Sequence, residues 1–109
     1  MKNRVVITGL GAIAPTGMGK EDFWHSLMKG TSGARGISFP DCDKEQFGSQ
    51  IACPVDNFSL TDYILGSKDL RFLGTTSQFA MAATKLALED AGIEVEMRTN
   101  GKKEQNYSL

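Results

Sequence analysis

The pattern of apolar and polar residues along the chain predicts one buried strand and two helices. Residues 4–8 form a short stretch with three β-branched apolar residues, Val5, Val6 and Ile7, and Gly9 follows it. Such a stretch is typical of a buried strand. Residues 20–29 carry an apolar stripe with helical spacing, acidic residues in the first turn and Gly30 as a stop signal. The stripe consists of Phe23, Trp24, Leu27 and Met28.

The second predicted helix, over residues 69–91, is the clearest element in the sequence. Its apolar positions recur with the period of a helix, and Gly92 follows as a stop signal. Alanines are frequent in this stretch and let neighbouring backbones approach closely, so we expect the helix to be buried on more than one side. The face expected to be apolar comprises Phe72, Phe79, Ala83, Leu86 and Ala87.

Glycine and proline punctuate the part of the chain between these helices. Residues 30–58 predict a long connection with one short strand near residues 50–53, and residues 57–63 predict a helical turn. Such a long connection is unusual in a self-sufficient domain. Residues 94–109 are polar and lack periodicity, which predicts a frayed tail. We therefore divide the chain into residues 1–93 and this tail.

Composition and charge narrow the classes of protein that fit. The chain has 109 residues, of which 40% are hydrophobic and 23% charged, as in one ordinary globular domain or part of one. A net charge of −1 argues against a partner nucleic acid, which favours a basic surface. No apolar run approaches a membrane span or a signal peptide, so we expect a cytoplasmic location. Cys42 and Cys53 are then expected to be reduced thiols.

A glycine motif follows the first predicted strand, and such a motif occurs both in dinucleotide-binding turns and where two backbones pack closely. Gly9, Gly11 and Ala14 have the G-x-G-x-x-A spacing of a dinucleotide-binding turn. That turn needs a helix that begins at its third small residue and meets the pyrophosphate. Here Pro15 and two further glycines follow, and no acidic residue ends a second strand at the usual distance. We favour close packing without a cofactor, and an NAD-dependent oxidoreductase fragment is the alternative.

The reactive side chains do not assemble into a catalytic centre. Cys42 stands between Asp41 and Asp43, whose negative charges disfavour the thiolate that a nucleophile needs. Cys53 lies in a short apolar run, so we expect it to be buried and inert. His25, the one histidine, is expected to be a partly exposed residue of the first helix. These few, scattered residues also give no metal site.

Three stretches of the sequence, taken in order, carry a family resemblance. They are RVVITGLGAIAPTG, FWHSLMKGTSG and KDLRFLGTTSQFAMAATKLALEDAGI. Together they resemble the N-terminal segment of the β-ketoacyl-acyl-carrier-protein synthases, the condensing enzymes of fatty-acid and polyketide synthesis. The resemblance implies an α/β fold, namely the N-terminal part of a thiolase-like αβαβα sandwich that is incomplete on its own. Residues 4–8 would be its first core strand and residues 72–91 a helix of its central layer.

The resemblance also implies a reaction and partners. The family performs a decarboxylative Claisen condensation, in which a cysteine takes the acyl chain from acyl-carrier protein and two histidines assist decarboxylation of the malonyl unit. Those residues come after the matched segment, so we assign no catalytic role to Cys42, Cys53 or His25 and expect the chain alone to be inactive. A homodimer or a partner chain is expected. The alternative is a non-catalytic module that binds the carrier protein.

Two basic residues, Lys68 and Arg71, share one face at the start of the second predicted helix. By themselves they indicate a solvated helix end or a small patch that binds an anion. Family members dock the acidic carrier protein through a stretch that resembles S-K-x-x-R, and residues 67–71 match it. The resemblance therefore implies carrier-protein contact at this pair. The next position, often basic in the family, is Phe72 here.

Overall fold

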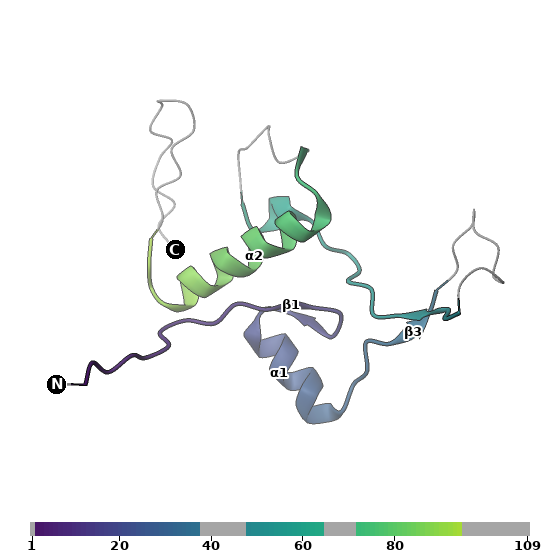
Figure 1. The fold of residues 1–109 in the computed structure, drawn as a ribbon, viewed down its shortest axis with the longest axis horizontal. Helices are drawn as coiled ribbons and strands as arrows, with labels where there is room; N and C mark the ends of the chain where they lie inside the picture. Colours follow the sequence, from purple (N-terminus) through teal and green to yellow (C-terminus); the bar gives the residue numbers. More distant parts are fainter. Residues whose placement is uncertain (1, 38–47, 65–71, 95–109) are drawn as a thin grey trace.

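The computed structural model describes residues 2–37, 48–64 and 72–94, and two helices dominate this part of the chain. The elements in chain order are β1 (Ile13–Ala14), β2 (Gly17–Met18), α1 (Lys20–Lys29), β3 (Arg35–Gly36), β4 (Ile51–Ala52), a 3-10 turn η2 (Leu60–Asp62) and α2 (Thr75–Asp90). β1 pairs with β2 and β3 with β4, both antiparallel. Figure 1 shows the β1–β2 hairpin between α2 and α1.

The first predicted helix is confirmed at both of its ends. α1 covers Lys20–Lys29, with acidic residues in its first turn. After it, Gly30 has a left-handed backbone with φ 68°, and its N–H donates to the Leu27 carbonyl at 3.0 Å. The Thr31 N–H donates to the Ser26 carbonyl at 2.9 Å. These two bonds form the turn that glycine favours after a helix.

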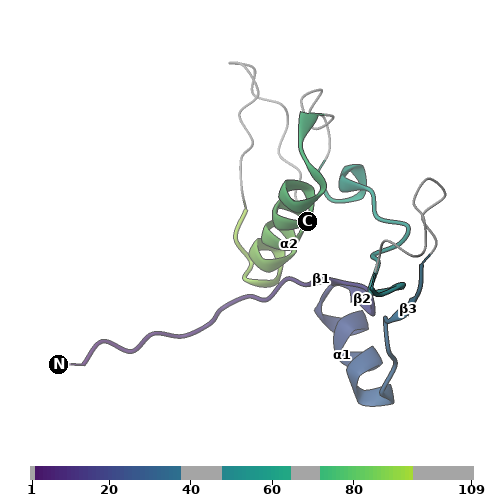
Figure 2. The ribbon, with the colours of Figure 1, turned by 45° about the vertical axis from the view of Figure 1, so that its right-hand side comes forward.

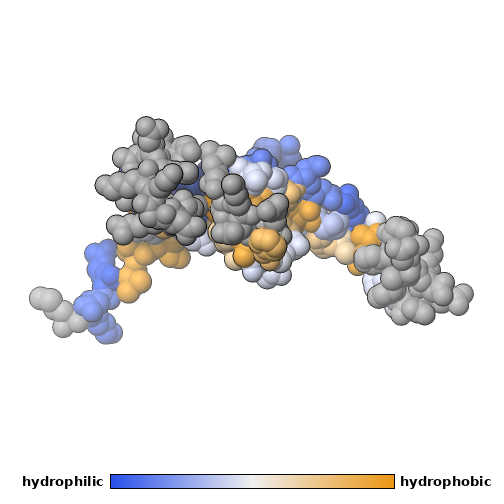
Figure 3. Space-filling view, turned by 90° about the horizontal axis from the view of Figure 1, so that it is seen from above, coloured by the Kyte–Doolittle hydropathy of each residue, from blue (hydrophilic) through white to orange (hydrophobic). Residues whose placement is uncertain are grey.

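Residues 4–8 are extended, but they are not the buried strand that the sequence predicts. They pair with no strand within the described residues, and Val5, Val6 and Ile7 are 92%, 68% and 83% exposed. Figures 1 and 2 show this segment projecting away from the helices, and its apolar surface is open in Figure 3. A strand is buried only when other segments pair with its edges and cover its faces. The described residues supply neither for residues 4–8.

The second helix is confirmed, but it begins later than the sequence predicts. α2 covers Thr75–Asp90 instead of residues 69–91, and residues 69–71 lie outside the described part of the chain. Gln78 stabilises this start, because its side-chain amide donates to a backbone carbonyl ahead of the helix at 2.8 Å. Phe72, which was expected on the apolar face, therefore precedes the helix and is exposed.

The stop signal of the second helix is also confirmed. Gly92 has a left-handed backbone with φ 69°, and its N–H donates to the Glu89 carbonyl at 3.0 Å. The Ile93 N–H donates to the Leu88 carbonyl at 2.9 Å. The same arrangement of hydrogen bonds thus ends both helices, each time with glycine in the left-handed position.

The connection between the helices holds more structure than the sequence predicts. The short strand expected near residues 50–53 is β4, and its partner β3 was not expected. The helical turn expected in residues 57–63 is η2. Residues 38–47 lie outside the described part. Each strand has only two residues, so none carries the alternation of polar and apolar positions by which strands are predicted.

A small core lies between η2 and α2. Leu60, Ile64 and Ala82 are the buried apolar residues of the described part of the chain. Phe58 extends this core, because its ring meets the ring of Phe79 edge-on with 4.8 Å between centroids. Aromatic pairs favour this geometry. The core anchors the middle of the chain to α2, and it leaves other faces of the helix free for the N-terminal segment.

Candidate functional site

The glycine motif lies directly on the backbone of α2. A Cβ atom on Gly9 would lie 2.2 Å from the Ala87 carbonyl oxygen, and one on Gly11 would lie 2.1 Å from the Ala83 carbonyl oxygen. These distances are far shorter than a van der Waals contact, so only glycine allows the segment to approach this closely. Ala91, which follows the last residue of α2, lies one turn beyond Ala87, and its Cβ atom would be 2.8 Å from the same Cβ on Gly9. The predicted close packing of the motif is confirmed.

This packing also argues against the alternative that the glycine motif binds a dinucleotide. The side of Gly9 and Gly11 that lacks a side chain faces carbonyl oxygens of α2, whose partial negative charge disfavours a pyrophosphate. The next helix, α1, begins only at Lys20, after the β1–β2 hairpin, so its N-terminus does not follow the third small residue of the motif. The residues present do not fit a dinucleotide. The motif instead packs the extended N-terminal segment against α2.

Close contacts of the same kind hold the hairpin against α1. A Cβ atom on Gly17 would lie 2.5 Å from the Phe23 nitrogen, so glycine is needed there as well. The Gly19 N–H donates to the Ala12 carbonyl at 2.8 Å and closes the hairpin. The Ser26 hydroxyl donates to a carbonyl of the hairpin turn at 2.5 Å. The hairpin and α1 therefore form one packed unit.

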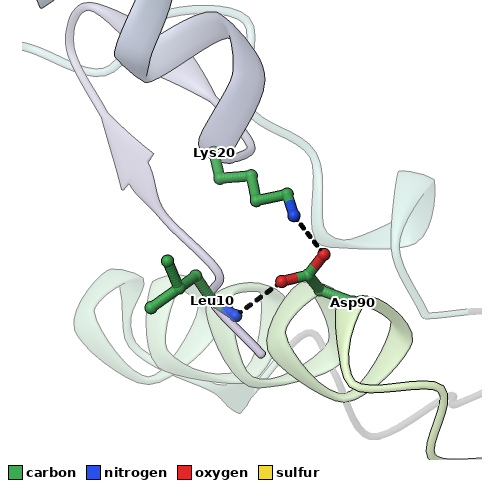
Figure 4. Close-up of polar contacts among 3 residues, drawn as sticks. All are labelled: Leu10, Lys20 and Asp90. Atoms are coloured by element: carbon green, nitrogen blue, oxygen red, sulfur yellow. Dashed lines mark hydrogen bonds and ion pairs between the residues drawn. The ribbon is translucent and has the colours of Figure 1, made fainter. Parts of the chain in front are cut away.

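Asp90 joins this unit to α2 and to the N-terminal segment. It is the last residue of α2, and its Oδ2 accepts the Leu10 N–H at 2.9 Å. Its Oδ1 accepts a hydrogen bond from the ammonium of Lys20, the first residue of α1. Figure 4 shows both donors converging on the one carboxylate. The N-terminal segment and the start of α1 thus meet the end of α2, which lies 70 to 80 residues later in the chain, at a single side chain.

The two charges of this contact stabilise each other. The hydrogen bond from Lys20, and then that from the Leu10 N–H, lower the pKa of the Asp90 carboxyl below its ordinary value. The hydrogen bond to Asp90 raises the pKa of Lys20. Both groups are therefore ionised throughout the neutral range. Asp90 was not predicted as a site residue. Its place in the last turn of a helix is unusual for an acidic residue, because the helix dipole disfavours a negative charge there.

The reactive residues of the described part stand apart from this contact. Cys53 was expected to be buried, and this is wrong: its thiol is free and exposed. It follows β4, whose one partner within the described residues is the two-residue strand β3, so no layer in that part of the chain covers it. His25 is exposed on α1, as expected. Cys42, Lys68 and Arg71 lie outside the described residues, so their predicted roles stay predictions.

Two kinds of feature are absent from the described part of the chain. Within residues 2–37, 48–64 and 72–94, no group of three or more histidine, cysteine, aspartate or glutamate side chains could hold a metal ion. In the same part of the chain, neither helix has the length and apolar character that a bilayer crossing requires. The candidate site is the contact of the glycine motif, α2 and Asp90, where the backbones approach most closely and one carboxylate joins the segments.

Comparisons with known proteins give consistent results. Residues 2–104 match the family model described as the β-ketoacyl synthase N-terminal domain. The chain is 39% identical over 94 residues to 3-oxoacyl-[acyl-carrier-protein] synthase 2 of Coxiella burnetii, which covers 86% of this chain and 22% of that protein. A relative from Streptomyces violaceoruber, named for a β-ketoacyl synthase of granaticin polyketide formation, gives the same identity and coverage. The chain spans about a fifth of the length of these relatives.

A solved structure gives the same result at the level of the fold. The structure described as the ishigamide ketosynthase/chain length factor matches with a TM-score of 0.68 and 39% identity. The match covers 81% of this chain and 21% of that chain. The predicted resemblance and the predicted fold, an N-terminal part of a thiolase-like α/β sandwich, are confirmed.

Proposed function

The chain belongs to the β-ketoacyl synthase family, and from this premise we propose that it is the N-terminal part of a 3-oxoacyl-acyl-carrier-protein synthase. The whole enzyme would condense an acyl thioester with a malonyl thioester, with loss of carbon dioxide, in fatty-acid or polyketide synthesis. The observation that carries this proposal is the match over 86% of the chain to relatives named for both kinds of synthase. It does not decide between the two pathways.

Within such an enzyme we assign this segment a scaffolding role. Its packed features are the glycine motif on α2, the hairpin on α1 and the Asp90 contact that joins them. A cysteine nucleophile needs a neighbouring base that forms its thiolate. Within the described residues, no hydrogen bond or ion pair joins the Cys53 or His25 side chain to such a partner. In the family, the nucleophile and its histidines lie beyond the matched segment.

A graft tests this proposal. Residues 1–94 would replace the matching segment of the Coxiella burnetii relative, and condensation would be measured with acyl- and malonyl-carrier protein. We expect the graft to keep activity, and the same graft with Gly11→Val to lose it. Gly36→Ala is the matched control, because a Cβ atom on Gly36 meets no atom within 4 Å. An unsubstituted graft that folds but does not condense would contradict the proposal.

The purified 109-residue chain provides the complementary experiment. With radiolabelled malonyl-carrier protein we expect no condensation product, because the segment supplies structure and no activated nucleophile. Turnover above background would contradict the scaffolding role. A chain that binds carrier protein but supports no activity in the graft would favour the alternative, a non-catalytic carrier-binding module.

We propose acyl-carrier protein as the partner of the whole enzyme, with Lys68 and Arg71 as its contacts. The support is the S-K-x-x-R stretch of the sequence and the basic character of both side chains, which suits an acidic partner. The double substitution K68E/R71E should then greatly weaken carrier-protein binding, measured by calorimetry. K2E/R4E changes the net charge equally at two exposed residues and should leave binding unchanged. Equal loss in both variants would contradict a specific docking site.

Further aspects of the predicted function remain proposals. A homodimer or a partner chain would cover the exposed apolar side chains of residues 4–8, and sedimentation of the chain tests this. The exposed thiol of Cys53 suits a reducing compartment, which supports the cytoplasm. The division of the chain into residues 1–93 and a polar tail rests on sequence, since residues 95–109 lie outside the described part.

A further inference from the structure

Two charged residues stand at helix ends where the helix dipole disfavours them. Lys20 is the first residue of α1, where the dipole is positive, and Asp90 is the last residue of α2, where it is negative. Neither charge stabilises its own helix. The two side chains instead pair with each other across the gap between the helices. Their positions therefore point to a role in joining segments.

Asp90 also accepts a hydrogen bond from the N-terminal segment, at the place where the backbone of that segment comes closest to the backbone of α2. Leu10, whose N–H donates to Oδ2 at 2.9 Å, lies between Gly9 and Gly11. A Cβ atom on either glycine would collide with a carbonyl oxygen of α2. The carboxylate thus accepts a hydrogen bond from the backbone N–H that lies between the two glycines. The glycines have no side chains with which to hold the segment on α2, so this hydrogen bond supplies a specific attachment there. Hydrogen bonds to charged groups are among the stronger ones in proteins.

We propose that Asp90 is a latch that fixes the N-terminal segment on α2 and ties both to the start of α1. With the latch closed, residues 4–8, which include the exposed apolar Val5, Val6 and Ile7, leave the packed body in one direction. Without the negative charge, the Leu10 amide keeps only a weaker, uncharged acceptor and Lys20 loses its counter-charge, so the segment separates from the helix more often. This inference stands on the contact geometry and does not depend on the proposed function.

The charged groups around the latch are few in the described part of the chain. From α1 come Lys20 and Glu21, and the negative charge of Glu21 also favours the ionised form of Lys20. The N-terminal segment contributes the uncharged Leu10 amide. On α2 itself the neighbouring Glu89 pairs with Lys85 at 2.9 Å. The latch therefore opens in acid when the Asp90 carboxylate is protonated, and this occurs below the ordinary range because its pKa is lowered.

Amide spectra of the ¹⁵N-labelled chain over a range of pH test the latch. The chemical shift of the Leu10 amide should titrate with a midpoint below that of an ordinary aspartate. Its protection factor, the intrinsic exchange rate divided by the observed rate, should fall through the same range. No variant is needed for this measurement, so it does not depend on how a substituted chain folds. A Leu10 amide whose shift does not titrate in acid would overturn the proposal.

Three variants separate the latch from a general effect of charge. Asp90→Asn keeps a neutral acceptor, so it should abolish the acid titration of the Leu10 amide and lower its protection from exchange. Lys20→Met keeps the carboxylate, so the titration should persist with its midpoint raised toward the ordinary value. Glu89→Gln removes a paired carboxylate one residue away and should change neither property. Equal effects of Glu89→Gln and Asp90→Asn on Leu10 would contradict the proposal.

Discussion

The N-terminal segment has two halves that behave in opposite ways. Residues 4–8 are exposed and include the apolar Val5, Val6 and Ile7, whereas residues 9–11 contain two glycines and pack on α2. The difference shows that burial depends on whether another surface of the right shape is present, and less on the hydropathy of the residue itself. Two glycines and a row of alanines give such a surface, because their backbones approach closely. Exposed apolar side chains instead mark a surface that another segment or chain covers.

The packed half should be the more sensitive to substitution. Gly11→Val places a side chain where the Ala83 carbonyl oxygen lies 2.1 Å from the Cβ position. Because the obstacle is backbone, we expect the free energy of unfolding to fall by about 3 kcal/mol, the upper end for overpacked sites. Chemical denaturation measures this change. Gly36→Ala, at a position with open space, should stay within about 0.5 kcal/mol, and an equal loss there would contradict the packing argument.

The small core should give the next largest effect. Leu60 is 4% exposed, and Leu60→Ala removes its side chain from the contact between η2 and α2. We expect a loss of about 2 kcal/mol, the lower end for such truncations, since so small a core can partly close the cavity. Ile51→Ala is the matched control, because Ile51 is 67% exposed. A larger loss from Ile51→Ala would show that the core lies elsewhere.

The Asp90–Lys20 pair should affect stability less than the substitutions at Gly11 and Leu60, and its effect should depend on pH. The lowered pKa of Asp90 gives stability that is present above its unfolded value and lost as the pH falls through the folded value. The raised pKa of Lys20 gives stability that is present below its unfolded value and lost as the pH rises through the folded value. Thermal unfolding across pH should therefore show a small difference between the parent chain and Lys20→Met that is constant at neutral pH and vanishes at both extremes. A difference that grows in acid would show that another group controls it.

The exposed half should give the smallest effect on stability. Val5→Asp changes a side chain that is 92% exposed, so we expect the free energy of unfolding to change by at most about 0.5 kcal/mol. The same substitution should reduce self-association, because it places a charge in the exposed apolar surface. Sedimentation velocity measures the association. A strong destabilisation without any change in association would show that residues 4–8 are buried within the folded chain.

Features with local signals were predictable from the sequence. α1 was found with both ends because acidic residues open it and Gly30 closes it. The end of α2 was found through Gly92, but its start was not, since the apolar period continues back to Phe72 while the hydrogen bond of Gln78 fixes the first turn later. The packing role of the glycine motif followed from the residues that come after it, which do not begin a helix.

Features that depend on distant residues were not predictable in the same way. The sequence does not show that the glycine motif meets α2, because Gly11 and Ala83 are far apart in the chain. The exposure of Cys53 was missed because its short apolar run resembles a buried strand, and the structure shows that no layer among the described residues covers β4. Asp90 was missed because one acidic residue among many has no distinctive spacing, and its role depends on where Lys20 and Leu10 lie.

The contact between Gly11 and α2 also limits which second substitutions restore a damaged chain. An overpacked site is commonly rescued by a smaller neighbour, but here the nearest atom is the carbonyl oxygen of Ala83, which every residue type carries. Ala83→Gly would remove a methyl group and leave the obstacle in place. We therefore expect a suppressor screen of Gly11→Val to recover reversion to glycine but no compensating change at position 83. Because of this contact, we expect position 11 to tolerate glycine alone, whatever residue stands at position 83.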